Sequence, residues 1–353
     1  MTKKIAVILL NLGGPDKLSS VKHFLFNLFN DPAIIRLYNP FRWLLAKLIA
    51  SRREEKAKGI YSQMGGGSPI FDLTLRQAKA LEDVLSNKKK DQEFKILVSM
   101  RYWHPFASEV IEKLRKFSPD EILLLPLYPQ FSTTTTQSSL KEFASLLKKS
   151  DLKNVNLKSV CCYYQDPDFI KAQANLIKDK IDKFKDKFRI LFSAHGLPEY
   201  IIKQGDPYQF QIEETSKKIV KELAINKLDY VVCYQSKVGP LKWLGPSTEE
   251  ELLKAAKENI AVVVVPIAFV SEHSETLVEL DIEYKELFEQ NCKKAYIRVP
   301  ALNEEESFIQ CLANQVELML NGTPKVSKDN LKLFTKSVCA DNFVNCICNN
   351  KGI

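Results

Sequence analysis

Short, purely apolar runs alternate with longer amphipathic stretches along most of the chain. Runs such as Ile5–Leu10 and Ile260–Ile267 carry hydrophobic residues at consecutive positions, which is typical of strands buried on both faces of a parallel sheet. The stretches between such runs favour helices near residues 74–86, 108–117, 139–149, 168–184, 210–224, 248–258 and 304–320. This alternation predicts an α/β fold built on doubly wound parallel sheets.

The first part of the chain recurs in the second part. Ile5–Pro15 and Phe188–Pro198 are both apolar runs that enter a turn containing glycine and proline, and Pro126 falls in register with Pro266. The matched pairs are 5–15 with 188–198, 95–105 with 229–240, 122–132 with 262–272, and 155–175 with 295–314. Because the matches keep their order, we predict two similar halves with a ligand cleft between them, outside the carboxyl ends of the strands.

The predicted first half covers residues 1–165 and the second half covers residues 166–320. The first two strands are separated by about ninety residues in the first half and about forty in the second, so the first half carries an insertion at about 16–70. We expect residues 321–353 to form a poorly ordered C-terminal extension.

The insertion is rich in apolar and aromatic residues and ends in a basic cluster of Arg52, Arg53 and Lys56. Three interpretations stay open: the lip of a cleft for a flat apolar ligand with acidic edges, a surface that rests on anionic lipid, or an extra helical pair packed on the core. No apolar segment approaches the ~20 residues of a membrane span, so any membrane contact is expected to be peripheral.

Charge and cysteine content narrow the class further. The net charge of +8 is moderate and no basic stripe with interleaved aromatic residues is present, so nucleic acid is not an expected partner. The eight cysteines are scattered, which suits buried thiols in a reducing cytoplasm. The N-terminal apolar run is short and lacks a small-residue cleavage site, so we interpret it as a strand and not as a signal peptide.

An acidic segment, residues 271–284, follows directly after a buried strand and predicts a helix. Glu275, Glu279 and Glu283 recur every fourth residue and therefore face one side of that helix, and His273 opens the segment. Because like charges at this spacing repel one another, a row of carboxylates at a strand end indicates a path for a cation or for protons.

His195 ends the first strand of the second half, beside a glycine and close to a proline. One interpretation is a histidine hydrogen-bonded within a turn. The other is an active-site group that the loop exposes to the cleft, where it would face Glu275 from a neighbouring strand end. An imidazole combined with a carboxylate suits a borderline metal ion such as Fe²⁺, Co²⁺ or Zn²⁺.

Eight motifs occur in order over about residues 5–320: LLNLGGP, YSQMGGGSPI, MRYWHP, LPLYPQFS, FSAHGLP, GDPY, QSKVGPLKWLGP and PIAFVSEHSETLVELDIEY. Together they resemble the ferrochelatases, the enzymes that insert ferrous iron into a porphyrin. The resemblance implies a chelatase-type fold and, as the reaction, insertion of Fe²⁺ into protoporphyrin IX to give protohaem, the terminal step of haem biosynthesis.

The resemblance also implies roles for individual residues. His195 and Glu275 would flank the metal as catalytic groups, and His273, Glu279 and Glu283 would belong to a proton or ion relay behind it. The residues that it places near the porphyrin, its propionates or the pocket wall are Leu12, Arg52, Arg53, Tyr61, Ser68, Arg101, Tyr102, Tyr128 and Trp243.

The cysteines of the tail depart from the family pattern. Some ferrochelatases carry an iron–sulfur cluster on C-terminal cysteines and one internal cysteine. Here the tail has Cys339, Cys346 and Cys348, and the internal position is Thr133. Since a [2Fe–2S] cluster normally needs four ligands, we do not expect one, and we expect no cofactor to be required beyond the substrate Fe²⁺.

Three other functions remain open. A cobalt or nickel chelatase of the same architecture would have a similar site, and a ferrochelatase for coproporphyrin would need more basic partners for its four carboxylates. The apolar insertion favours protoporphyrin IX. A non-catalytic tetrapyrrole carrier is the third. The expected partners are protoporphyrin IX and Fe²⁺, with peripheral contact at the inner face of a membrane. We expect a cytoplasmic monomer or homodimer.

Overall fold

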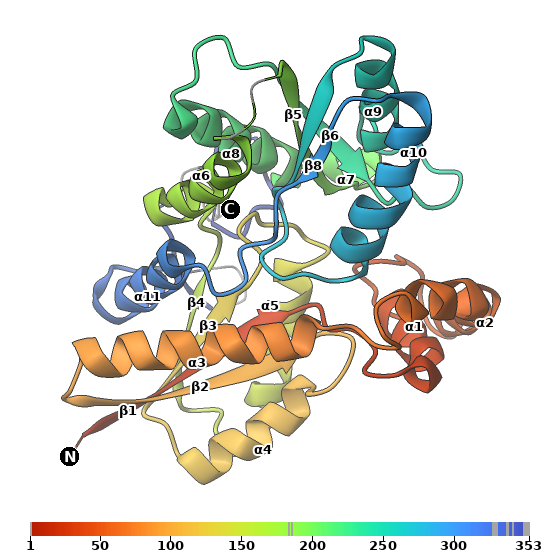
Figure 1. The fold of residues 1–353 in the computed structure, drawn as a ribbon. Helices are drawn as coiled ribbons and strands as arrows, with labels where there is room; N and C mark the ends of the chain where they lie inside the picture. The colour runs from red at the N-terminus through yellow and green to blue at the C-terminus, as the bar shows by residue number, and fades with distance from the viewer. Residues whose placement is uncertain are drawn as a thin grey trace.

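Two separate sheets form the frame of the protein in a computed structural model, which describes residues 2–182, 184, 186–326, 331–336, 339–340 and 342–348. Figure 1 shows one sheet in the N-terminal part of the chain and the other in the C-terminal part, each with helices packed against it. The strand orders are β2-β1-β3-β4-β10-β9 and β6-β5-β7-β8. Apart from the antiparallel β9–β10 pair, the neighbouring strands run parallel.

The internal duplication is visible in this topology. The first four strands of one sheet and the four strands of the other share a single order, in which the earliest strand lies between the next two. Their bounds are β1 (Lys3–Asn11), β2 (Gln92–Met100), β3 (Glu121–Pro126), β4 (Asn156–Val160), β5 (Phe188–His195), β6 (Tyr230–Gln235), β7 (Ala261–Pro266) and β8 (Tyr296–Arg298). The predicted fold class, two similar doubly wound parallel-sheet halves, is confirmed.

Burial explains why the strands read as continuous apolar runs. Along β1, Ile5, Val7 and Leu9 belong to one hydrophobic cluster. Ala6, Ile8 and Leu10 point to the other face and belong to a second cluster. Since both faces are covered, polar residues are excluded from alternate positions, which is the pattern of a central parallel strand.

The helices expected from amphipathic periodicity are present, with ends shifted by a few residues. They are α3 (Ile70–Lys88), α4 (Ala107–Phe117), α5 (Thr136–Lys148), α6 (Pro167–Ile181), α8 (Tyr208–Leu223), α9 (Thr248–Lys257) and α11 (Glu306–Asn321). The acidic segment forms η2 (Glu275–Glu283), a π-helix, which continues as α10 (Tyr284–Asn291). A short helix, α7 (Glu199–Lys203), follows β5.

Two helices cross between the halves. α6 follows the first sheet in sequence but packs against α8, whereas α11 comes late in the chain and packs against α3 and the strands β3 and β4. The tail also returns to the first sheet, where β10 (Lys332–Phe334) pairs with β4 and carries β9 (Lys325–Val326) at the edge. The proposed boundaries at 165 and 320 stay predictions, but the chain from α11 onward is structurally part of the first half.

The insertion forms a helical pair beside the first sheet (Figure 1). It consists of η1 (Leu18–Ser20), α1 (Val21–Phe29) and α2 (Phe41–Ser62), which pack around Val21, Phe24 and Ala50 in a cluster of their own. Several large apolar side chains on it stay exposed: Leu37, Tyr38, Phe41, Trp43, Leu44 and Leu48. Among the described helices, none combines the length and apolar character required to cross a bilayer.

Candidate active site

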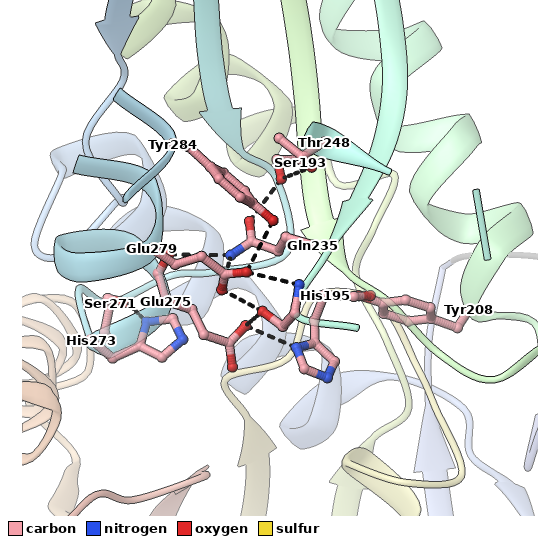
Figure 2. A network of polar contacts seen from close by, with 11 residues as sticks. Ser193, His195, Tyr208, Gln235, Thr248, Ser271, His273, Glu275, Glu279 and Tyr284 are labelled. Carbon is pink, nitrogen blue, oxygen red and sulfur yellow. Dashed lines mark hydrogen bonds and ion pairs between the residues drawn. The ribbon is translucent and has the colours of Figure 1, made fainter. Parts of the chain in front are cut away.

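His195 and Glu275 meet at the carboxyl ends of adjacent strands. His195 is the last residue of β5, and Glu275 opens η2 a short loop after β7, which pairs with β5. The imidazole Nδ1 lies 2.8 Å from Glu275 Oε2 (Figure 2). Neither side chain is sealed in the core, because 38% of His195 and 23% of Glu275 remain exposed. The pair predicted from the strand ends is thus brought together where a ligand can reach it.

Glu279 lies one turn further along η2 and is held by neutral donors. The Ser236 backbone N–H donates to Glu279 Oε1 at 2.9 Å, and Gln235 Nε2 donates to Oε2 at 3.1 Å. The Tyr284 hydroxyl adds a bond of 3.1 Å. Ser236 Oγ connects the two carboxylates, since it lies within hydrogen-bond distance of Glu275 and of Glu279. Figure 2 shows these bonds gathering on Glu279, with Glu275 linking the network to His195.

The pKa values follow from burial and from this network. Burial works to raise the pKa of Glu275, but the charge of His195 and the hydrogen bond from it outweigh burial and lower that pKa to about 2. Burial alone would lower the pKa of His195, and the Glu275 carboxylate more than compensates, so that the pKa is raised. Burial and the charge of Glu275 raise the pKa of Glu279. The site therefore holds an ionised Glu275 beside a more basic Glu279.

The two remaining relay candidates are placed differently. His273 is buried, with Nδ1 3.2 Å from the Ser271 carbonyl oxygen and its ring 4.6 Å from that of Phe269. Burial lowers the pKa of His273 despite the nearby Glu275, so this imidazole is neutral at pH 7. Glu283 ends η2 with an exposed side chain. A relay role for either residue stays a prediction.

Two aromatic residues, from α8 and from the segment after β6, contact His195. The Tyr208 hydroxyl donates to the His195 carbonyl oxygen at 3.1 Å. Trp243 approaches edge to face, with 6.4 Å between the ring centroids. Gly196 leaves room for Trp243, because a Cβ there would lie 3.2 Å from its ring and 3.0 Å from the Gln235 carbonyl oxygen. These contacts fix the imidazole without using its second ring nitrogen.

Tyr61 of α2 connects the helical pair to the segment that carries Glu275, through a hydrogen bond with Ser274. Burial raises the pKa of Tyr61 to about 12, with a hydrogen bond to Ser274 opposing the shift and the charge of Glu275 adding to it. Arg52 is exposed, and Arg53 lies over the Phe29 ring at 5.6 Å. Ser68 precedes α3 and donates its backbone N–H to the Pro15 carbonyl oxygen at 2.8 Å.

The other predicted pocket residues surround Asp31 in the first half. Arg101 donates to Asp31 Oδ2 at 2.8 Å and to Glu142 Oε1 at 2.9 Å, and the Tyr102 hydroxyl donates to Asp31 at 2.8 Å. Tyr128 is half-buried nearby, with a pKa that burial raises, and Leu12 packs against the helical pair. The guanidinium of Arg101 is thus already bound to two carboxylates.

Three residues of these networks were missed by sequence reasoning. Gln235 ends β6 inside the QSK motif, and Ser236 follows it with a positive φ of 64°, which a serine rarely adopts. Asp31 lies in the loop after α1, where an aspartate most often caps a turn. Gln235 and Ser236 could have been proposed from their position at a strand end, but nothing in the sequence distinguishes Asp31.

A cluster of thiols lies apart from the metal pair. The sulfur atoms of Cys161, Cys346 and Cys348 lie within 4.8 Å of one another. Cys339 packs in the same buried cluster and accepts a hydrogen bond from Gln211 at 3.0 Å. Hydrogen bonds from Cys161 and Cys346 lower the pKa of Cys348 to about 6. Cys161, which directly follows β4, is therefore the internal cysteine that lies beside the tail thiols.

The number of converging thiols bears on whether the protein could hold an iron–sulfur cluster. That expectation counted three tail cysteines against the four ligands of a [2Fe–2S] cluster. Cys161 converges with two tail cysteines, Cys346 and Cys348, while Cys339 packs in the same buried cluster. Three converging thiols are fewer than the four ligands that a [2Fe–2S] cluster normally needs, so the expectation of no required cofactor stays a prediction.

The fold is shared with solved chelatase structures. SirB from Bacillus subtilis with Fe³⁺ superimposes with a TM-score of 0.54 at 12% identity, over 90% of this chain and 96% of that one. The sirohydrochlorin chelatase SirB from Bacillus subtilis subspecies spizizenii, in complex with cobalt, gives a TM-score of 0.51 at 10% identity, over 90% and 95% of the two chains. At this identity the likeness establishes the chelatase fold alone.

Sequence comparison then specifies the family. The ferrochelatase family model matches residues 4–320. The ferrochelatase of Pelagibacter ubique (strain HTCC1062) is 51% identical over 347 residues, which cover 98% of this chain and 99% of that protein. The ferrochelatase of Rickettsia felis is 51% identical over 352 residues, 99% of each chain. The chain belongs to the ferrochelatase family.

Proposed function

We propose that the protein inserts Fe²⁺ into protoporphyrin IX and releases two protons, forming protohaem. Family membership supports this reaction, and the observation that carries the assignment of the site is the His195–Glu275 pair, 2.8 Å apart and partly exposed at the carboxyl ends of β5 and β7. The iron remains ferrous throughout, so the insertion requires no electron donor.

His195 is the proton acceptor in this proposal. Its Nδ1 faces Glu275, which leaves Nε2 to meet a pyrrole N–H of the substrate. The Glu275 carboxylate fixes the orientation of the ring and stabilises the imidazolium that forms on proton transfer. Tyr208 donates to the backbone carbonyl of His195 and so helps to fix the end of β5 from which the ring projects.

Glu275 and Glu279 handle the cation and the released protons. Glu275 is ionised at neutral pH and can replace part of the hydration shell of Fe²⁺. Glu279 has a raised pKa and shares the Ser236 hydroxyl with Glu275, so a proton that reaches Glu275 has a hydrogen-bonded acceptor behind it. Bending of the macrocycle against the lip would expose the pyrrole nitrogens, with the strain supplied by binding of the ring edge and propionates.

The test is an anaerobic assay of porphyrin loss with Fe²⁺, run beside Co²⁺ and Ni²⁺ and with coproporphyrin as a second acceptor. We expect catalytic turnover with Fe²⁺ and protoporphyrin IX, and loss of insertion in His195→Ala with porphyrin binding retained. A spectral shift that stops at one equivalent would identify a carrier. Wild-type turnover of His195→Ala would remove this histidine from the mechanism.

The lip supports a proposal of peripheral membrane contact. Its exposed apolar side chains, Leu37, Tyr38, Phe41, Trp43, Leu44 and Leu48, share one helical pair with the basic residues Arg52 and Arg53. Apolar side chains beside basic ones are typical of a surface that rests on anionic lipid. Cosedimentation with anionic vesicles should fall in Phe41→Ser/Leu44→Ser, and equal pelleting of the double variant would contradict this proposal.

Insertion chemistry needs no cofactor beyond the substrate metal. The thiols nearest to a possible [2Fe–2S] position are Cys161, Cys346 and Cys348, whose sulfur atoms lie within 4.8 Å of one another, with Cys339 in the same buried cluster. When bound, such a cluster supplies one-electron redox chemistry, which no step proposed above uses. The four thiols would join the tail to the end of β4, because Cys161 directly follows that strand.

A further inference from the structure

The segment that carries the metal pair contains more carboxylates than the proposed site uses. Between β7 and α10 these are Glu272, Glu275, Glu279, Asp281 and Glu283. Glu275 and Glu279 are bound by neutral donors and by His195. Glu272 and Asp281 flank them in sequence and have another partner. The carboxylates of this segment thus fall into two groups: those bound to His195 and neutral donors, and those bound to one other side chain.

That partner is Arg298, the last residue of β8. Its Nε donates to Asp281 Oδ1 at 2.7 Å, and its Nη2 donates to the second oxygen of the same carboxylate. Its Nη1 donates to Glu272 Oε1 at 2.5 Å. The side chain is well shielded, with 13% of its surface exposed. Arg298 thus uses the planar fork of the guanidinium to join two points of one segment.

The two points enclose the functional residues. Glu272 precedes His273 and Glu275, and Asp281 follows Glu279 on η2. Glu272 Oε1 also accepts the Ala301 backbone N–H at 2.9 Å. The Tyr296 hydroxyl donates to the Leu280 carbonyl oxygen at 2.6 Å. β8 and the loop after it therefore anchor the segment at each side of the metal pair.

We propose that Arg298 is a positioning residue for metal insertion: it clamps the loop and the π-helix so that Glu275 faces His195, and it occupies Glu272 and Asp281 so that Glu275 and Glu279 remain available to the cation. This inference rests on the proposed function. Arg298 does not touch the imidazole of His195 and acts through the backbone it holds. Displacement of a reacting group by about 1 Å can cost on the order of 100-fold in rate.

A buried ion cluster could instead serve stability alone, and a matched control separates the two roles. Arg189, in β5 of the same sheet, is also shielded, with 10% of its side chain exposed. It binds Asp229 at 3.0 Å and Glu258 at 2.8 Å. It lies near the start of β5, whereas His195 ends that strand. Arg189→Met therefore removes a similar ion cluster at the amino ends of the strands, away from the metal pair.

The experiment compares Arg298→Met with Arg189→Met and wild type. Thermal unfolding, porphyrin binding by fluorescence, and the kcat and KM for Fe²⁺ insertion are measured for each. We expect both variants to lose stability and to bind porphyrin as wild type does. The kcat of Arg298→Met should fall on the order of 10- to 100-fold, while that of Arg189→Met stays within about twofold of wild type.

Several results would overturn the inference. Arg298→Met could keep wild-type kcat, or Arg189→Met could lose as much kcat at a similar loss of stability. Should Arg298→Met fail to fold, Arg298→Lys replaces it. Lysine keeps the charge without the fork, so a reduced kcat supports the inference and wild-type kcat rejects it. Wild type is the check on the proposed function: its failure to insert iron would reject that function independently of any difference between the variants.

Discussion

The two halves place polar clusters at the same point of the same topology but balance their charge differently. In the first half, Arg101 follows β2 and binds both Asp31 and Glu142. In the second half, the equivalent strand β6 ends in Gln235, a neutral residue. Among the described residues, neither Glu275 nor Glu279 forms an ion pair with a lysine or an arginine. The first cluster contains a permanent cation, whereas the second is balanced only by the titratable imidazole of His195.

This difference indicates where a cation can be handled. The guanidinium of Arg101 already occupies both carboxylates of the first cluster, so they have less to offer a metal ion. Gln235, Ser236 and Tyr284 donate hydrogen bonds to Glu279 without adding positive charge. Attraction for Fe²⁺ is therefore retained in the second half. A duplicated fold has kept a structural cluster in one copy and a chemical one in the other.

The largest expected effect comes from removing one carboxylate in each half. Glu275→Gln should lower kcat for iron insertion on the order of 100- to 10,000-fold, because His195 loses the group that orients it and stabilises its protonated form. Glu142→Gln should change kcat by about twofold or less, since Arg101 keeps its bond to Asp31. Steady-state kinetics with Fe²⁺ check both, and equal losses would abolish the contrast between the halves.

The next effect concerns the contribution of the Asp31–Arg101 cluster to stability. Asp31→Asn should cost roughly 3 kcal/mol in the free energy of unfolding, because a shielded Arg101 and the Tyr102 hydroxyl lose a charged acceptor. The porphyrin KM should rise more than kcat falls, since Asp31 joins the helical lip to the core. Urea unfolding measures the first effect. The exposed Arg115–Asp151 pair provides the control, and a similar loss of stability in Asp151→Asn would contradict this explanation.

A smaller effect is a shift in the titration of His195. In the wild type, Glu275 raises the pKa of His195 above its ordinary value of 6.5, so this pair stabilises the fold fully below pH 6.5 and the contribution is lost as pH rises through the folded-state pKa. In Glu275→Gln, burial is opposed by the charge of Glu279 alone, and the pKa of His195 should fall. NMR titration of the metal-free proteins measures both, and an unchanged pKa would show that Glu275 does not control this imidazole.

Much of the fold was readable from the sequence because the signals are local. Strands buried on both faces leave unbroken apolar runs, and the repeat revealed the two sheets. The exchange of α6 and α11 and the return of β10 to the first sheet depend on packing between distant segments, which periodicity does not encode. His195 and Glu275 were predictable because parallel strand ends converge at one edge. Cys161 and Arg298 were not, since their partners come from other parts of the chain.

The smallest expected effect tests how far the acidic path extends along η2. Sequence spacing placed Glu279 and Glu283 in one row, but Glu279 is hydrogen-bonded to Ser236 and Gln235 while Glu283 is exposed at the end of the helix. Glu279→Gln should lower kcat on the order of 10-fold, because it removes the acceptor behind Glu275, whereas Glu283→Gln should change kcat by about twofold or less. Kinetics at several Fe²⁺ concentrations compare the two variants. If the kcat of Glu283→Gln falls as far as that of Glu279→Gln, the path extends to the protein surface. An exposed carboxylate would then take part in the relay.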